Sequence, residues 1–344
     1  MRLFGGGVSK RTESAVLIDI GAASVGGACA KFVGDEPTLV YTRRLPIELR
    51  KGEAHERAML RALEVLGDAL IREGAPALLR ETGSGTPVDF LVSIDSPWQQ
   101  TVIRTERIEK QEPFVFTKGL VNDVLKKAGA VEKGMLLSSE SIIGTILNGY
   151  ETRDPYGKRV HRASVLILTS YIDHRIAEGV TALLERFYHT KHIPLISGSS
   201  LRYQVVRIAF PYERDAIILD ASSPLVALAL VRNSLLAVIS ETPDGAVGSP
   251  EWLKEIRNVL SEFAKRYPLP RTIFLLARET DVGNLRETLA AADIGSLWLS
   301  DSPPNIVSIL TSHVASSVHQ AAESSPDLHL ILMALYWQHR NTLE

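Results

Sequence analysis

Two segments of the chain place an aspartate at the end of an apolar run and follow it with small residues. The first is Asp19-Ile20-Gly21-Ala22-Ala23-Ser24, and the second is Asp220-Ala221-Ser222-Ser223. Glycine and small side chains allow backbone N–H groups to approach phosphate oxygens, and a carboxylate organises Mg²⁺ through water. Taken alone, each segment is better interpreted as a strand-end turn that holds no ligand. A phosphate and magnesium site is the alternative interpretation.

The other polar clusters carry weaker signals. Four histidines lie close together in the sequence, between residues 161 and 192. No carboxylate or cysteine accompanies them at the spacing of metal ligands, so a solvated helix end is the better interpretation and no metal site is predicted. Neither Gly/Ser loop is followed by the lysine of a P-loop. The single cysteine, Cys29, cannot form an intramolecular disulfide and suits a buried apolar position. The histidines are His161, His174, His189 and His192, and the loops are Gly83-Ser84-Gly85 and Gly198-Ser199-Ser200.

Composition bounds the class of protein. The chain has 344 residues, of which 45% are hydrophobic and 23% charged, enough for two domains or one bilobal domain. With 38 basic and 40 acidic residues, its formal charge of −2 gives no electrostatic case for a nucleic-acid partner. The N-terminus lacks the apolar core of a signal peptide, and we expect no transmembrane helix because no apolar run is long enough. Membrane association would then need a partner.

The surroundings of the two aspartates repeat. Residues 18–41 and 217–240 share one order of elements: a strand, an aspartate, small residues, a second strand, a turn and a third strand. Such a duplication predicts two similar lobes around a cleft. The expected strands are 15–20, 28–33 and 38–41 in the first copy and 215–220, 225–231 and 235–240 in the second.

Hydrophobic periodicity predicts the remaining elements. The last helix is densely apolar and lacks a wide basic face, which favours a core helix over a surface anchor. Only one helix is predicted between residues 241 and 270. The expected helices are 53–73, 117–127, 173–189, 250–266, 285–292 and 328–338, and the expected strands are 88–94, 104–110, 139–150, 163–169, 193–196, 272–277 and 296–299.

This order of elements resembles the superfamily of actin, sugar kinases and the Hsp70 ATPase domain. The segments Asn148-Gly149-Tyr150 and Asp154-Pro155-Tyr156-Gly157 resemble the small SHS2 insertion of FtsA, and the lead Met1-Arg2-Leu3-Phe4 is similar to PilM. The resemblance implies an α/β, bilobal, actin-like (ribonuclease H-like) fold with duplicated β-meander lobes and an SHS2-type inserted subdomain.

The same resemblance divides the chain. Its expected parts are a flexible lead at 1–13, the first lobe at 14–96, the insertion at 97–196, a return to the first lobe at 197–213, a reduced second lobe at 214–325 and a closing helix at 326–344. The second lobe is expected to lack the extra subdomain of full-length relatives.

For the candidate site, the resemblance implies residual ATP and Mg²⁺ positions. These are Asp19, Gly21, Ser24, Asp220, Ser222 and Ser223. Several groups depart from the superfamily's pattern: Pro224 removes a backbone donor, and Arg278 and Glu279 stand where a glycine pair normally admits the adenosine. We therefore expect weak ATP binding and slow or absent hydrolysis, and we assign no catalytic residue.

The function implied is a cytoplasmic scaffold at the inner face of the membrane. A PilM-like protein would hold the cytoplasmic tail of a type IV pilus assembly protein. One alternative is an FtsA-like division protein that ties a tubulin-like filament to the membrane, and another is an active ATPase or small-molecule kinase. The insertion, with Tyr150 and Arg153 at its turn, is the expected partner site, and a homo-oligomer is left open.

Overall fold

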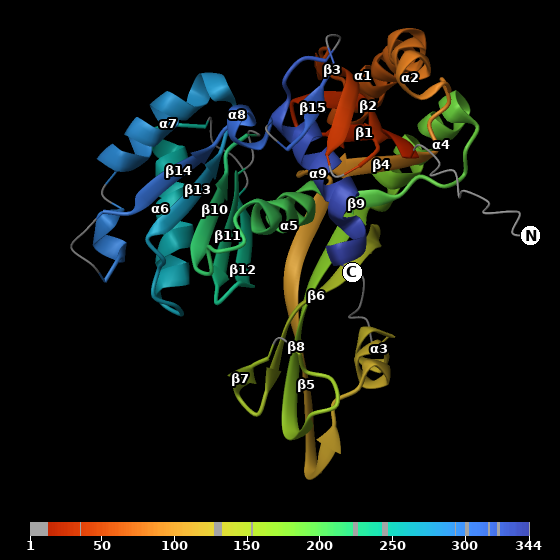
Figure 1. Ribbon diagram of the computed structural model, residues 1–344. Helices are drawn as coiled ribbons and strands as arrows, with labels where there is room; N and C mark the ends of the chain where they lie inside the picture. Colours follow the sequence, from red (N-terminus) through yellow and green to blue (C-terminus); the bar gives the residue numbers. More distant parts are fainter. Residues whose placement is uncertain are drawn as a thin grey trace, which may run out of the picture.

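The structure, a computed structural model, consists of two α/β lobes side by side and a narrow third part that projects from beneath them (Figure 1). No helix among the residues described is long and apolar enough to cross a bilayer. The described residues are 13–34, 36–126, 133–152, 154–222, 226–242, 247–292, 294–299, 303–315, 317–321 and 324–343.

The first lobe is built on a six-stranded sheet with the order β15-β3-β2-β1-β4-β9. Its first three strands form an antiparallel meander, and β4 and β9 then add in parallel to β1. Both faces of β1 are buried, as expected for a sheet covered by helices on both sides. The strands are β1 (Glu13–Ile20), β2 (Ser24–Phe32), β3 (Pro37–Pro46), β4 (Asp89–Ile94), β9 (Leu195–Ser197) and β15 (His319–Gln320).

Three helices cover the outer face of this sheet. Leu63 and Leu66 of α1 are fully buried against it. A Cβ on Gly67 of α1 would lie 2.7 Å from the Phe187 ring of α4, so the missing side chain allows the two helices to approach. The expected helix at 53–73 is two segments in the structure. The elements are α1 (His55–Ala69), a π-helical segment (Leu70–Gly74), α2 (Ala75–Thr82) and α4 (His174–Tyr188).

The second lobe repeats the plan of the first. Its sheet has the order β12-β11-β10-β13-β14, again a meander followed by two parallel strands. The connection from β12 to β13 contains one helix, α6, within its described residues. The elements are β10 (Ala216–Asp220), β11 (Val226–Arg232), β12 (Leu235–Thr242), α6 (Pro250–Ala264), β13 (Thr272–Leu276), α7 (Glu279–Ala291) and β14 (Asn305–Ile309).

Two helices lie between the lobes, α5 (Gly198–Ala209) and α9 (Leu328–Leu343), while short α8 (Thr311–Ala315) packs beside α9 (Figure 1). One apolar cluster joins the inner face of the first sheet, α5, α9 and the inner face of the second sheet. The last helix is therefore a core helix, as its apolar character predicted. The layers run from the helices of one lobe, through two sheets with α5 and α9 between them, to α6 and α7. This arrangement confirms the predicted bilobal actin-like fold class.

The projecting part is a four-stranded sheet with the order β5-β8-β6-β7, packed on α3. Helix α4 and strand β9, which the prediction included in the insertion at 97–196, pack instead with the first sheet, because α4 buries its apolar face against it. The assignment of the insertion to the SHS2 type stays a prediction. The elements are β5 (Gln99–Val115), α3 (Lys118–Lys126), β6 (Met135–Leu147), β7 (Tyr150–Glu151) and β8 (Arg159–Asp173).

The strand expected at 296–299 is wrong. A short 3₁₀ helix, Gly295–Leu297, occupies this place. Trp298 turns into the core of the second lobe, where its Nε1–H donates to the Pro270 carbonyl at 2.8 Å. The fifth strand of the sheet is instead β14, a segment whose short apolar run, Ile306 to Ile309, we did not predict as a strand.

Candidate functional site

Strand alternation brings the two predicted aspartates into the layer between the sheets. Successive side chains of a strand point to opposite faces. Ala15 and Leu17 face the central core, so Asp19 at the end of β1 faces it too. Ile218 of β10 also faces the central core, so Asp220, two residues later at the end of that strand, faces it as well. Both carboxylates are buried, with exposed fractions of 1% and 5%.

A buried arginine joins the two lobes. Arg202 lies on α5, and its Nη2 and Nη1 donate to the two carboxylate oxygens of Asp95 at 2.7 and 3.1 Å. Its Nε forms an ion pair with Asp220. Asp95 follows β4 of the first lobe, whereas Asp220 ends β10 of the second. Gly198 makes the arrangement possible, because a Cβ there would lie 1.9 Å from Asp95 Oδ1.

A second arginine, Arg44, crosses the first sheet to reach Asp19. Gly26 lies between them in register, and a Cβ on it would lie 2.6 Å from the guanidinium. Arg44 Nη2 donates to Asp19 at 2.9 Å, and Nε donates to Asp327 at 2.6 Å. Its Nη1 also donates to Ser24 Oγ at 3.0 Å. The hydroxyl expected to contact phosphate is thus bonded to a guanidinium of the chain itself.

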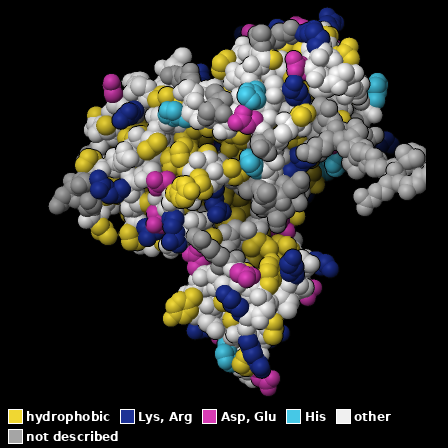
Figure 2. Space-filling view, viewed as in Figure 1, with side chains coloured by type: hydrophobic (Ala, Val, Ile, Leu, Met, Phe, Trp, Pro, Cys, Tyr) yellow, Lys and Arg dark blue, Asp and Glu magenta, His cyan; other side chains and the backbone are white. Residues whose placement is uncertain are grey.

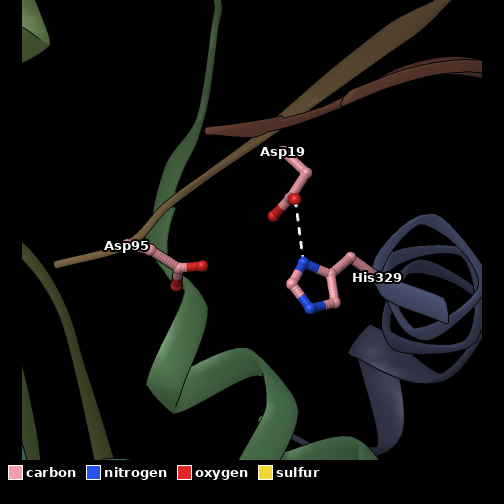
Figure 3. A group of neighbouring side chains, drawn as sticks. All are labelled: Asp19, Asp95 and His329. Atoms are coloured by element: carbon pink, nitrogen blue, oxygen red, sulfur yellow. Dashed lines mark hydrogen bonds and ion pairs between the residues drawn. The ribbon is translucent and has the colours of Figure 1, made fainter. Parts of the chain in front are cut away.

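His329, on the first turn of α9, bridges the two predicted motifs. Its Nδ1 lies 2.9 Å from Asp19 Oδ2, as Figure 3 shows. Its Nε2 lies 2.8 Å from Ser222 Oγ. Ser222 in turn donates to Asp220 through its hydroxyl and, at 3.1 Å, its backbone N–H. A continuous chain of hydrogen bonds therefore runs from the first lobe to the second.

The pKa shifts follow from burial and these partners. Burial alone would raise the pKa of Asp19, but His329 and Arg44 hold it below its ordinary value. Asp220 has a lowered pKa because Arg202 and His329 outweigh its burial. The pKa of Asp95 is raised because burial outweighs Arg202. For His329, burial favours the neutral form, but Asp19 outweighs it and raises the pKa.

The groups present do not fit a magnesium–nucleotide complex. The Gly21 N–H, which should face a phosphate, donates to the Ser24 carbonyl at 2.9 Å. Asp19, Asp95 and His329 offer ligand atoms that all lie within 4.8 Å of one another (Figure 3). Both oxygens of Asp95 already accept from Arg202, however. Asp19 Oδ1 is buried and has no hydrogen-bond partner among the described residues. A cation here would have to displace the guanidinium groups.

A cavity of about 230 Å³ lies beside this network. Its walls include Ser222, His329, Arg44 and Ala277, with Arg278 at the place expected for adenosine. The Arg278 side chain is 73% exposed and pairs with Asp281 at 2.6 Å, so it stands at the mouth. Ser223 and Pro224 lie outside the described residues, as does the Glu279 side chain.

The structure thus brings together Asp19, Ser24, Asp220 and Ser222 of the predicted set, with Gly21 in the adjoining turn. Sequence reasoning missed the groups that connect them. Asp95 had a signal, because it follows an apolar strand parallel to the strand that ends in Asp19. The others lie in a strand interior, in helices or, for Asp327, immediately before α9, and a single sequence offers no motif that connects them to the two aspartates. They are Arg44, Arg202, Asp327 and His329.

Of the two predicted partner residues, the structure describes Tyr150, which lies on the projecting part. Tyr150, in β7, is 78% exposed, and Arg153 lies outside the described residues. The tip of this part carries basic and acidic side chains interspersed, without a patch of one sign on the face shown in Figure 2. The hairpin neighbours Glu151 and Thr152 line a hollow of about 570 Å³ that faces the second lobe.

A groove of about 560 Å³ lies where the insertion meets the first lobe, between β6, α4 and β9. Its lining is largely apolar and includes Leu136, Ala177, Thr181, Ala182 and Ile193. Strand β6 pairs with β8 along one edge. Along its other edge, strand pairing among the described residues occurs only where Ile146 and Leu147 pair with β7. Most of that edge of β6 therefore has backbone groups without a strand partner.

No protein-family model matches the chain, and no curated protein matches it. Among solved structures, it is similar to a PilM–PilN type IV pilus biogenesis complex, with a TM-score of 0.55 and 13% identity over 97% of this chain and 98% of that chain. A protein from Bacteroides thetaiotaomicron, described as having an actin-like ATPase fold and unknown function, is similar at a TM-score of 0.45 and 8% identity over 95% and 98% of the two chains.

At these identities, the likeness concerns the fold and not the activity. The duplicated sheets, the two central helices and the cleft between the lobes agree with it. The chain therefore has the fold of the actin-like ATPase superfamily, and a PilM-containing complex is among the structures that it resembles.

Proposed function

We propose that the chain is a PilM-like scaffold that binds the cytoplasmic tail of a type IV pilus assembly protein at the inner face of the membrane. The observation that carries this proposal is the cleft between the lobes, where Arg44, Arg202 and His329 pair with the aspartates, two of them predicted to hold a nucleotide. The partner is then expected to bind at a surface outside this cleft. The similar solved structure, a complex of PilM with PilN, supports the same interpretation.

The energy of the network argues against nucleotide binding. Mg-ATP would have to separate Arg202 from Asp95 and Asp220, all of which are nearly inaccessible to solvent. Breaking a buried ion pair costs about 3–5 kcal/mol. Since each 1.4 kcal/mol is tenfold in affinity, ATP would bind roughly a hundredfold to a few thousandfold more weakly than it would to the same site without these ion pairs. Residual binding of ATP and Mg²⁺ is thus expected to be weak.

The groove between β6, α4 and β9 suits an extended tail. An added strand can pair with the open edge of β6 through main-chain hydrogen bonds, while its alternate side chains enter the apolar lining. Ser138 Oγ donates to the Leu195 carbonyl at 2.8 Å, which holds β6 beside β9 and keeps the groove formed. The groove lies between the insertion and the first lobe, the region expected to carry the partner site.

Fluorescence anisotropy tests the proposal. The probes are fluorescein-labelled peptides that copy the N-terminal cytoplasmic segments of the single-pass membrane proteins encoded beside this gene. Ala182→Arg should reduce the affinity at least ~10-fold, about 1.4 kcal/mol, by placing charge in the groove. Leu299→Arg, at an 89% exposed position in the second lobe, is the matched control and should bind as wild type does.

Two outcomes would overturn this assignment. If Ala182→Arg bound as tightly as wild type while Tyr150→Ala did not, the partner site would lie at the tip of the insertion. If no pilus tail bound but a tubulin-like filament co-sedimented with the protein, the division role would replace the pilus role. Peripheral attachment to the membrane would then follow from that partner.

A further inference from the structure

Three residues in the cleft stand in the order acid, imidazole and hydroxyl. Asp19 Oδ2 lies 2.9 Å from His329 Nδ1, and His329 Nε2 lies 2.8 Å from Ser222 Oγ. Because Asp19 is ionised and can only accept, Nδ1 carries the hydrogen. In neutral His329 the lone pair of Nε2 then faces the serine hydroxyl. This is the arrangement that activates serine in Ser-His-Asp hydrolases, which is recognised by geometry and roles and not by sequence order.

The hydroxyl is reachable from a cavity. Ser222 is half-buried, and both it and His329 line the cavity of about 230 Å³. Arg44, Arg278 and Asp327 also line this cavity. Arg44 is paired with Asp19 and Asp327 inside the cleft, whereas Arg278, 73% exposed at the mouth, pairs with Asp281. A carboxylate or phosphate group on an ester would compete with Asp281 for the Arg278 guanidinium, and a guanidinium can stabilise the negative charge that develops on a carbonyl oxygen.

Asp220 is the competing partner of the same hydroxyl. Its carboxylate also accepts the Ser222 N–H and pairs with Arg202, and these contacts keep it ionised and weakly basic. His329 is the stronger base of the two, because its pKa is raised by Asp19. When His329 is neutral, the serine proton therefore passes to Nε2 and not to Asp220.

We propose that Ser222 is a nucleophile toward small anionic esters, with His329 as its general base and Asp19 as the positioning residue. Ser222 Oγ attacks the carbonyl carbon while its proton moves to Nε2. The ester C–O bond breaks, and the proton on Nε2 passes to the departing alkoxide, which leaves as the alcohol. Water repeats the sequence on the acyl-serine, giving the acid and regenerating the hydroxyl. This chemistry requires no nucleotide and is independent of the proposed tail groove.

A fluorophosphonate probe tests the nucleophile on the full chain. Attack of Ser222 Oγ on phosphorus expels fluoride, and intact mass spectrometry with peptide mapping then finds one adduct at Ser222. Ser222→Ala should lose the adduct. His329→Gln, which retains a hydrogen-bonding side chain but no base, should slow labelling by about 10²-fold or more. Ser84→Ala, in an exposed loop of the first lobe, is the control and should label as wild type does.

The pH profile separates a base from a structural bridge. The labelling rate should rise as pH rises through the raised pKa of His329, because only neutral imidazole accepts the proton. Asp19→Asn removes the charge that raises this pKa, so the profile should move to lower pH. The charged groups that influence His329 are Asp19, Arg44, Asp95, Arg202, Asp220 and Asp327.

Turnover of mono-4-nitrophenyl succinate against neutral 4-nitrophenyl butyrate tests the substrate class. The succinate ester should be hydrolysed faster, and Arg278→Glu should reduce that preference at least ~10-fold. The proposal is overturned if Ser222 forms no adduct, if the adduct lies elsewhere, or if His329→Gln, folded by circular dichroism, labels at the wild-type rate. If Ser222→Ala is unfolded, its loss of labelling does not support the proposal. The labelling rate of His329→Gln is then the deciding measurement.

Discussion

Replacing Arg202 by methionine is the most direct perturbation of the bridge between the lobes. The change keeps an unbranched chain of similar shape on α5 but leaves the carboxylates of Asp95 and Asp220 buried without their cation. Their side chains are 3% and 7% exposed, so solvent cannot replace the guanidinium. Removing one partner of such a pair costs about 3–5 kcal/mol, a large part of the 5–15 kcal/mol that stabilises a typical fold.

Urea unfolding followed by circular dichroism and by tryptophan fluorescence measures this loss. Two probes are needed because a bilobal chain can unfold in more than one step. Arg207→Met is the matched control on the same helix, since Arg207 is exposed and lies 3.4 Å from the Tyr203 hydroxyl. We expect the control to lose no more than about 1 kcal/mol.

The defect of Arg202→Met should also depend on pH. Without the guanidinium, burial and mutual repulsion raise the folded-state pKa values of Asp95 and Asp220 above their unfolded values. Stability is then lost as pH rises through these raised pKa values, so the difference from wild type should be smaller at pH 5 than at pH 8. A loss below about 1 kcal/mol, or one that is the same at both pH values, would show that water reaches these carboxylates and would refute the reasoning.

Two further predictions concern His329 in the cleft and the contact between α1 and α4 on the outer face of the first lobe. The folded-state pKa of His329 is raised, so its contribution to stability is complete below the unfolded pKa and is lost as pH rises through the folded pKa. The urea midpoint should therefore fall between pH 5.5 and 8.5 in wild type and stay level in His329→Gln. Parallel curves for the two proteins would contradict this prediction. Gly67→Val should cost about 1–3 kcal/mol because a Cβ there lies 2.7 Å from the Phe187 ring, and Phe187→Leu should restore part of the loss in a double-mutant cycle. An additive double mutant would show that the two helices do not meet as described.

The sequence predicted the fold because the duplicated pattern of strand, aspartate and small residues is local. Asp19 and Asp220 were found for the same reason, and strand alternation could also have shown that both face the central layer. The segment at 296–299 could not be assigned by pattern, because an apolar residue such as Trp298 fits a strand and a buried turn equally well.

The groups that fill the cleft could not be predicted from the sequence. Arg44 reaches Asp19 only because Gly26 lies between them in register, and Arg202 reaches Asp95 only beside Gly198. His329 lies 310 positions from the carboxylate that it contacts. Such contacts depend on the packing of α5 and α9 between two sheets, which no local motif records.

Isothermal titration calorimetry with Mg-ATP tests the central claim that the chain's own cations occupy the predicted nucleotide site. The account predicts no saturable heat at ATP concentrations up to about 1 mM, corresponding to a binding free energy no stronger than about −4 kcal/mol. A micromolar Kd that disappears in Asp19→Asn would contradict it, because ATP would then have displaced the Arg44 and Arg202 ion pairs.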